Sequence, residues 1–162
     1  MKKLLLLLLI STTMAAQIKK AEVKYNAINI ATDPYAMYQE GGLNISFEYE
    51  HVENFGYVKV GVEFFPVLDG GYNFLYTAFG FNLKVGNFNN WRPYSGVKAG
   101  FVNRGKELYG NFGGEAGINY VFNNGAILGL KTDAIYRSDF LWSGADPEFQ
   151  GSGYIVIAFK LN

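Results

Sequence analysis

Hydrophobic and polar residues alternate along eight stretches of the chain. Such a period of two is typical of a β-strand with one apolar face. Turn signals such as "ENFG", "NRGKE" and "FNNGA" separate the stretches, and no segment of helical periodicity competes with them. The eight expected strands cover residues 21–30, 42–50, 57–65, 72–85, 91–102, 109–122, 126–137 and 151–161. The sequence therefore predicts an all-β domain.

The charged residues of these strands fall on the parity opposite to the apolar residues. In the first strand, for example, Tyr25 and Ala27 are assigned to the apolar face and Lys24 to the other. Acids and bases nearly balance on the charged face, which is required if they are buried together, because an unpaired buried charge is costly. We predict a buried charge network of Glu48, Lys59, Glu63, Lys84, Arg92, Lys98, Glu115, Lys131 and Asp133. Lys98 and Lys131 lie on the strands that flank Glu115 and are its expected partners.

Two architectures could use this pattern. In a soluble secreted or periplasmic β-barrel the apolar face points inward, whereas in an outer-membrane barrel it faces lipid and the charges fill the lumen. Large aromatic residues at the ends of the apolar faces favour the membrane barrel, as do glycines on the charged face, which leave room for long side chains. The prediction is a closed eight-stranded antiparallel up-and-down transmembrane β-barrel, in which the last strand pairs with the first.

The first residues have the order of a secretory signal peptide. Two lysines precede the apolar run Leu4–Ile10, and small residues follow up to Ala16. This run is too short for a spanning helix. We expect residues 1–16 to be cleaved and residues 17–162 to form the barrel. The remaining chain would be slightly acidic, which gives no reason to expect nucleic acid as a partner, and the chain has 0 cysteines.

The signal peptide, the strand number, the lumenal charges and the final strand with Ile155, Ile157, Phe159 and Leu161 carry a family resemblance. The chain resembles the small eight-stranded outer-membrane barrels: the transmembrane part of OmpA, the OmpX/Ail group and the opacity-type barrels. The resemblance implies a monomer in the outer membrane of a Gram-negative cell. It also implies contact with lipid and lipopolysaccharide, and recognition of the last strand by the barrel-assembly machinery.

Four connections would then face outward, at about residues 31–41, 66–71, 103–108 and 138–150. Their aromatic and apolar side chains have two possible interpretations. They could form a surface that recognises an unknown ligand, or they could fold onto the rim and sit at the lipid interface. The residues concerned are Tyr35, Met37, Tyr38, Phe140, Trp142 and Phe149.

The sequence gives little support for catalysis. The single histidine, His51, falls at the opposite end of the expected barrel from Ser138 and Ser143, so neither serine has a base to activate it. We therefore expect no enzyme, no cofactor and no metal site. The remaining function is a structural or surface-interaction role, with a narrow small-solute channel or a soluble ligand-binding β-barrel as the alternatives.

Overall fold

The computed structural model describes residues 24–83 and 90–161, and these form eight strands and two short helical segments. The elements are β1 (Lys24–Thr32), α2 (Pro34–Glu40), β2 (Ile45–Glu53), β3 (Gly56–Phe64), β4 (Asn73–Asn82), β5 (Trp91–Arg104), β6 (Glu107–Val121), β7 (Ala126–Arg137), η1 (Ser138–Ser143) and β8 (Glu148–Leu161). The expected signal peptide, residues 1–16, lies outside the described residues.

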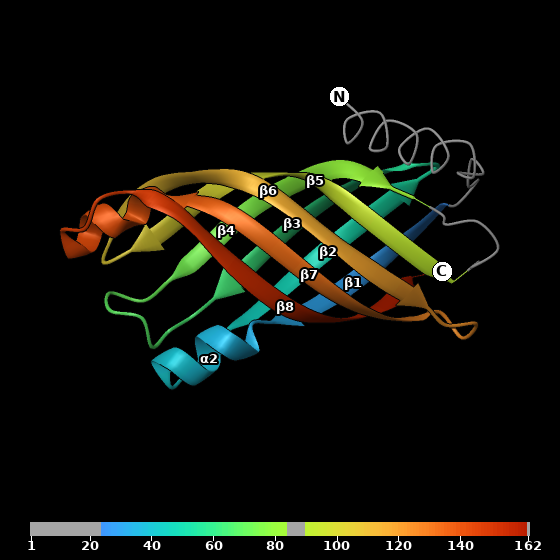
Figure 1. Cartoon of the computed structure of the whole chain (residues 1–162), viewed down its shortest axis with the longest axis horizontal. Helices are drawn as coiled ribbons and strands as arrows, with labels where there is room; N and C mark the ends of the chain where they lie inside the picture. The colour runs from blue at the N-terminus through green and yellow to red at the C-terminus, as the bar shows by residue number, and fades with distance from the viewer. Residues whose placement is uncertain (1–23, 84–89, 162) are drawn as a thin grey trace, which may run out of the picture.

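The strands form one closed barrel in the order of the sequence, β1 to β8 (Figure 1). Every neighbouring pair is antiparallel, and β1 also pairs with β8 from Asn26 opposite Leu161 to Thr32 opposite Ile155. Closure gives each strand a partner on both sides, so the sheet has no free edge. The predicted closed, eight-stranded, up-and-down barrel is confirmed.

Two helical segments, which the sequence pattern did not predict, lie within the connections expected at residues 31–41 and 138–150. Asp33 caps α2 by accepting bonds from the backbone N–H groups of Tyr35 and Ala36, Pro34 occupies the first turn, and Gly41 ends the helix in the left-handed conformation. These are ordinary start and stop signals, and the sequence carries them as "DP" and "GG". Periodicity does not reveal this helix, because it is only 7 residues long. The second segment, η1, is a 3₁₀-helix.

The outer wall of the barrel is apolar and the lumen is polar. Phe79, for example, is 60% exposed on the outside, whereas Lys59 on the inside is 1% exposed. This distribution inverts that of a soluble protein, in which exposed charges surround an apolar core. The predicted faces are correct for β2 to β8 over the described residues.

The predicted faces are wrong for β1. Tyr25 and Ala27 point into the lumen, and Ile28 and Ile30 lie on the wall. The reason is register: Ile28 pairs with outward residues of both neighbouring strands, and a period of two then turns Tyr25 inward. Lys24 is also outside, because it shares the parity of Ile28 and Ile30, and it forms an exposed ion pair with Glu53. Apolar residues on both parities of this strand made the sequence pattern ambiguous.

Aromatic residues form two bands on the outer wall. At the end of the barrel near residues 24 and 161, the ring centroid of Tyr120 lies 5.1 Å from Trp91 and 4.9 Å from Phe122. At the other end, Phe112, Tyr136 and Phe149 form a cluster with centroids 5.3–6.2 Å apart. The wall between the bands carries aliphatic residues such as Val60, Val97 and Leu130, together with Phe79 opposite Val97. This order matches the interfacial girdles of membrane barrels.

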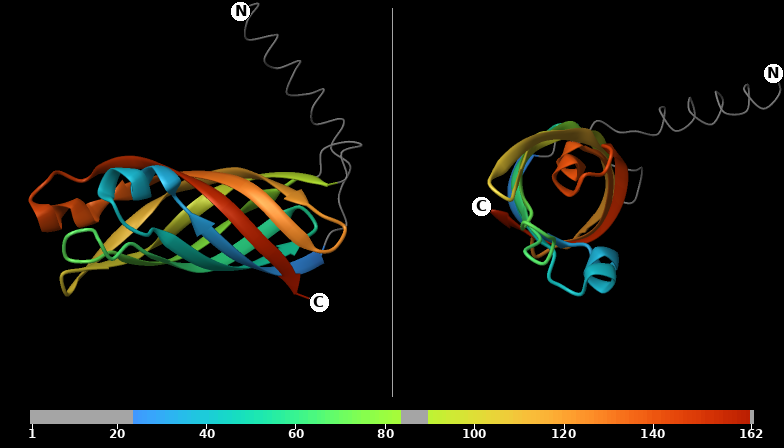
Figure 2. Two further views of the ribbon diagram at one scale, coloured as in Figure 1. Left: turned by 90° about the horizontal axis from the view of Figure 1, so that it is seen from below. Right: turned by 90° about the vertical axis from the view of Figure 1, so that its left-hand side faces the viewer.

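The two ends of the barrel differ. At the terminal end, where β1 begins and β8 finishes, short turns join β2 to β3 and β6 to β7. The helical end carries α2, η1 and the β3–β4 and β5–β6 connections (Figure 1). In the view along the barrel, η1 lies across the opening and α2 lies outside the wall (Figure 2). Within residues 24–83 and 90–161, no helix is long and apolar enough to cross a membrane.

Candidate functional site

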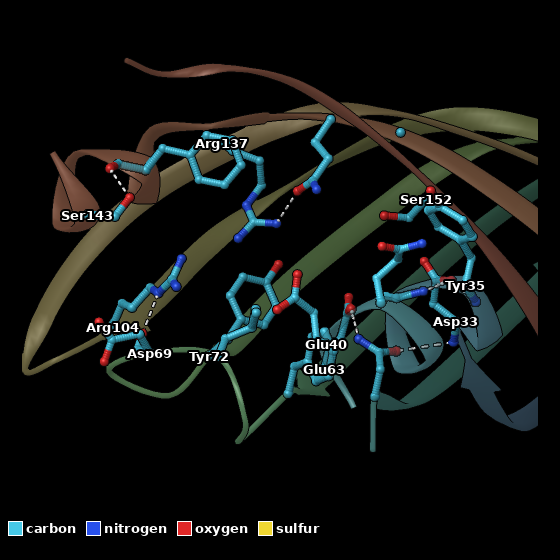
Figure 3. A pocket seen from close by; sticks show the side chains of 18 residues that line it. Asp33, Tyr35, Glu40, Glu63, Asp69, Tyr72, Arg104, Arg137, Ser143 and Ser152 are labelled. Atoms are coloured by element: carbon cyan, nitrogen blue, oxygen red, sulfur yellow. Dashed lines mark hydrogen bonds between the residues drawn. The ribbon is translucent and has the colours of Figure 1, made fainter. Parts of the chain in front are cut away.

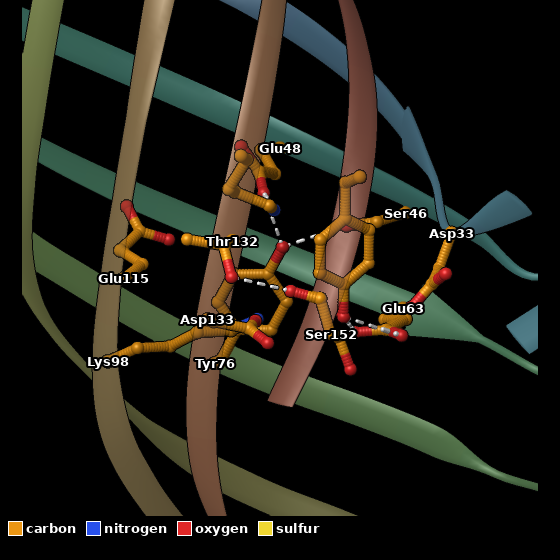
Figure 4. A network of polar contacts seen from close by, with 12 residues as sticks. Asp33, Ser46, Glu48, Glu63, Tyr76, Lys98, Glu115, Thr132, Asp133 and Ser152 are labelled. Atoms are coloured by element: carbon orange, nitrogen blue, oxygen red, sulfur yellow. Dashed lines mark hydrogen bonds and ion pairs between the residues drawn. The ribbon is translucent and has the colours of Figure 1, made fainter. Parts of the chain in front are cut away.

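A network of two lysines and two glutamates fills the middle of the lumen. Lys59 lies 2.8 Å from Glu115 and 3.9 Å from Glu48, and Lys131 forms a second ion pair with Glu48. The four side chains are at most 1% exposed and come from four strands, β2, β3, β6 and β7. We call these four residues the lumenal network (Figure 4 shows both glutamates). Because its members reach across the barrel, it ties distant parts of the wall together.

Tyrosine hydroxyls complete the network. Tyr57 donates to Glu115 at 2.8 Å, and Tyr76 donates to Glu48 at 2.7 Å. Glycine makes room for these rings: a Cβ at Gly61 would lie only 2.7 Å from the Cζ atom of Tyr76. The predicted function of glycine on the charged face is therefore seen directly at this position. The lumen is packed rather than open, as expected for an interior closed by eight strands.

The structure corrects the expected partners of Glu115. The sequence suggested Lys98 and Lys131, because they lie on the flanking strands, but the bound lysine is Lys59 from the far side of the lumen. Lys98 pairs instead with Asp133 at 2.8 Å. Adjacency of strands was therefore a poor guide to pairing. In a narrow lumen, long side chains reach across and meet partners from the opposite wall.

The other predicted network residues lie apart from this centre. Glu63 lies nearer the helical end, where Asn44 donates to it at 2.8 Å and Tyr154 at 3.3 Å. Arg92 is buried toward the terminal end and makes no ion pair with any residue that the structure describes. Lys84 lies outside the described residues.

A cavity of about 500 Å³ opens at the helical end of the barrel (Figure 3). We call it the vestibule. Its wall combines acidic side chains, the two guanidinium groups of Arg104 and Arg137, and apolar surface from Phe65, Tyr72 and Phe140. The middle of the lumen is therefore filled, while the mouth at this end holds space for a small molecule.

Asp139 holds η1 over the vestibule. Its carboxylate accepts two bonds from Arg137 at 2.6 and 2.7 Å, one from Arg104 at 3.1 Å and one from Asn111 at 2.8 Å. Burial alone would raise the pKa of Asp139, but these donors, chiefly Arg137, lower it below its ordinary value. The sequence did not predict this cluster, because residues 35 positions apart share no local signal.

The predicted surface residues differ in whether they are free for a ligand or lie at the lipid interface. Tyr35 and Tyr38 on α2 are 71% and 83% exposed. Phe149 lies on the outer wall against Phe112 and Tyr136, as the lipid-interface reading expects. The remaining three are more enclosed. Met37 contacts the Thr32 hydroxyl, Phe140 lines the vestibule, and Trp142 packs against Gly70 and Gly105, where any Cβ would collide with its ring.

The geometry of the single histidine offers no catalytic pair among the described residues. His51 lies on β2, where its Nδ1 contacts Asn26 at 2.8 Å and its Nε2 lies 3.5 Å from Glu53. Ser138 and Ser143 belong to η1 at the other end of the barrel. In the described part of the chain, no three or more His, Asp or Glu side chains are grouped so that they could hold a metal ion.

Comparison of the structure with solved structures identifies other small barrels. Neisserial surface protein A is similar with a TM-score of 0.52 and 10% identity, over 85% of this chain and 97% of that one. Ail from Yersinia pestis gives 0.50 and 12%, over 86% and 100%. The outer membrane enzyme PagL gives 0.51 and 14%, over 84% and 99%. At these identities the likeness shows the fold, and the predicted resemblance to small eight-stranded outer-membrane barrels is confirmed at that level.

In sequence comparisons, no family model and no curated protein matches the chain.

Proposed function

We propose that this chain is a β-barrel of the outer membrane of a Gram-negative cell, with a closed lumen and a structural or surface-interaction role. One observation carries the proposal: the wall exposes apolar side chains while the lumen buries ion pairs. In water, a continuous apolar wall of this kind would drive aggregation, whereas in a bilayer it makes contact with lipid chains. The similar folds support the same environment.

In this proposal the barrel is monomeric, its wall contacts lipid and lipopolysaccharide, and the barrel-assembly machinery inserts it. The helical end faces outward, because β1 begins and β8 ends at the other end, together with the β2–β3 and β6–β7 turns. The exposed tyrosines of α2 and the vestibule are then available to a ligand at the cell surface.

We also propose that the protein has no catalytic activity. This proposal is supported by the distance in the fold between His51 and the serines of η1. One similar structure, PagL, is an outer membrane enzyme, so assays for enzymatic activity belong with the tests. A channel role has less support, because the four residues of the lumenal network leave little free lumen at its middle.

A gel that compares boiled and unboiled detergent-solubilised protein tests the barrel. A folded barrel in detergent should migrate differently before boiling, since its closed sheet resists unfolding. Recovery of the protein in the soluble periplasmic fraction, with a single gel position, would overturn the proposal.

The orientation can be tested with single cysteines, because the chain has 0 cysteines of its own. Leu141→Cys on η1, where the native side chain is exposed, should react with a membrane-impermeant thiol reagent on intact cells. Asn124→Cys, in the turn between β6 and β7, should react only after the outer membrane is opened. The reverse pattern would show that the helical end faces the periplasm.

A further inference from the structure

Glu63 differs from most of the carboxylates buried in the barrel. Asp33 is also buried without an ion pair in the part of the chain that the structure describes, but it accepts three bonds from backbone N–H groups. Glu48, Glu115, Asp133 and Asp139 each have a lysine or arginine within 4.0 Å. Glu63 is 4% exposed, yet among the described residues it forms no ion pair and receives only the amide of Asn44 and the hydroxyl of Tyr154. A buried carboxylate without a counter-charge favours the uptake of a cation.

The nearest guanidinium is already engaged. Arg137 gives two hydrogen bonds to Asp139 and one to Gln150 at 2.7 Å, and its planar group stacks over Tyr72 at 4.6 Å. Arg104 is held by Asp139 and by the backbone carbonyl of Asp69. Neither arginine therefore forms an ion pair with Glu63, although Arg137 lines the same cavity.

A small second cavity lies at the inner end of the vestibule. Its volume is about 20 Å³, and it shares Glu63, Tyr72, Arg137, Gln150 and Ser152 with the vestibule wall. Lys98 lines it as well and is held by Oδ2 of Asp133 at 2.8 Å. This volume holds one group of the size of a water molecule. Asp133 also lines it, and its Oδ1 atom accepts no hydrogen bond from any described residue although the side chain is 1% exposed. Figure 4 shows Glu63, Asp133 and Ser152 in this part of the lumen.

We propose that this site binds the primary ammonium group of an unbranched aliphatic diamine or oligoamine. The ammonium group would donate to Glu63 and to Oδ1 of Asp133. The alkyl chain would lie in the vestibule against Phe65, Leu68 and Tyr72, and the second ammonium would meet the acids of the rim, Glu40 and Asp69.

Size and donor number select this ligand class. A primary ammonium has three donors and nearly the volume of water, whereas a quaternary ammonium or a guanidinium group is too wide for about 20 Å³. The described carboxylates are not grouped tightly enough for a metal ion. Glu50 also lacks an ion pair among the described residues, but it lines neither of these two cavities.

This inference deepens the proposed surface role, on which it rests, because it names a ligand class for the outward mouth. The test is calorimetric titration of the folded full-length barrel in detergent micelles with 1,4-diaminobutane. The salt concentration should be about 0.15 M, so that weak surface attraction is screened. We expect saturable binding of the diamine to one site. The bis-trimethylammonium analogue of the same chain length should bind with an affinity about tenfold or more lower.

The matched variants are Glu63→Gln and Glu148→Gln. Glu148 is an exposed carboxylate near the same end that does not line the vestibule. We expect Glu63→Gln to weaken binding of the diamine about tenfold or more, and Glu148→Gln to leave it unchanged. Equal affinities for the two variants, or equal affinities for the two probes on the unmodified chain, would overturn the inference.

The outcomes also separate this inference from the proposed function. Absence of any binding by a barrel that shows the heat-dependent gel shift would mean that only water occupies the site, and the inference alone would be wrong. A chain that never forms a heat-modifiable barrel would contradict the proposed function itself. If Glu63→Gln does not fold, the comparison of the two probes on the unmodified chain still decides the question.

Discussion

The middle of the lumen and the vestibule are built from the same residue types but have different properties. In the middle, each carboxylate of the lumenal network has a lysine partner, and tyrosine rings fill the remaining space. In the vestibule, the arginines gather on Asp139, Glu63 is left with neutral donors, and a cavity of about 500 Å³ remains. The comparison teaches that the filled part of this barrel is the part where lysines reach across to glutamates, whereas open space remains where the arginines gather on one carboxylate.

The largest expected effect on stability comes from removing an ion pair in the middle of the lumen. Lys59→Met leaves Glu115 without its lysine, so we expect it to lower the free energy of unfolding by about 3–5 kcal/mol. The double variant Lys59→Met/Glu115→Gln removes both charges and should lose less than the sum of the two single variants. Urea titrations of the barrel in lipid vesicles measure both. Strictly additive losses would mean that the lumen is not ion-paired.

The second effect concerns packing around the same network. A Cβ at Gly61 would approach Tyr76 to 2.7 Å and Glu48 to 3.0 Å, so Gly61→Ala should cost about 1–3 kcal/mol by overpacking. A Cβ added at Gly110 on β6 would meet no atom within 4 Å, so Gly110→Ala should be neutral or slightly stabilising. The same titrations compare the two variants. Equal losses at both positions would show that the lumen has spare room.

A smaller effect is expected at the helical end, where α2 depends on its cap. Asp33 accepts bonds from two backbone N–H groups of α2, and its other oxygen accepts one from Gly153 on β8. Asp33→Ala should therefore lower the local stability of α2 by about 1 kcal/mol. Hydrogen exchange of the Met37 amide measures this change. Tyr38→Ala is the control, because this side chain is 83% exposed and should change stability by less than about 0.5 kcal/mol.

The smallest effect is a local response of η1 to acid. The pKa of Asp139 is lowered in the folded state, so its contribution is complete above the unfolded pKa of about 3.9 and is lost as the pH falls further. In a Trp91→Phe background, the fluorescence of Trp142 should stay constant from about pH 8 to 5 and shift to longer wavelength below about pH 4. Asp139→Asn should abolish this transition. A transition near neutral pH would assign the response to another group.

The sequence by itself determined the number of strands, their approximate bounds and the charged face of seven of them. These features follow from local covalent geometry, since successive side chains of a strand point to opposite faces. The same local rule was insufficient for β1, where apolar residues occupy both parities and only pairing with β2 and β8 fixed the inward face of Tyr25. The residues that cap α2 can be recognised in the sequence. A helix of 7 residues is too short, however, to show a helical period of apolar residues.

Only the tertiary structure decided which charges meet. Lys59 and Glu115 are 56 positions apart, and Lys131 and Glu48 are 83 positions apart. Alternation shows that each of these side chains points inward, but it does not say which residue faces it across the lumen. That choice depends on the closure of the sheet, on the register of every strand pair and on the reach of each side chain. For the same reason the vestibule could not be predicted, because Asp139 draws the arginines away from Glu63 only once the barrel has closed.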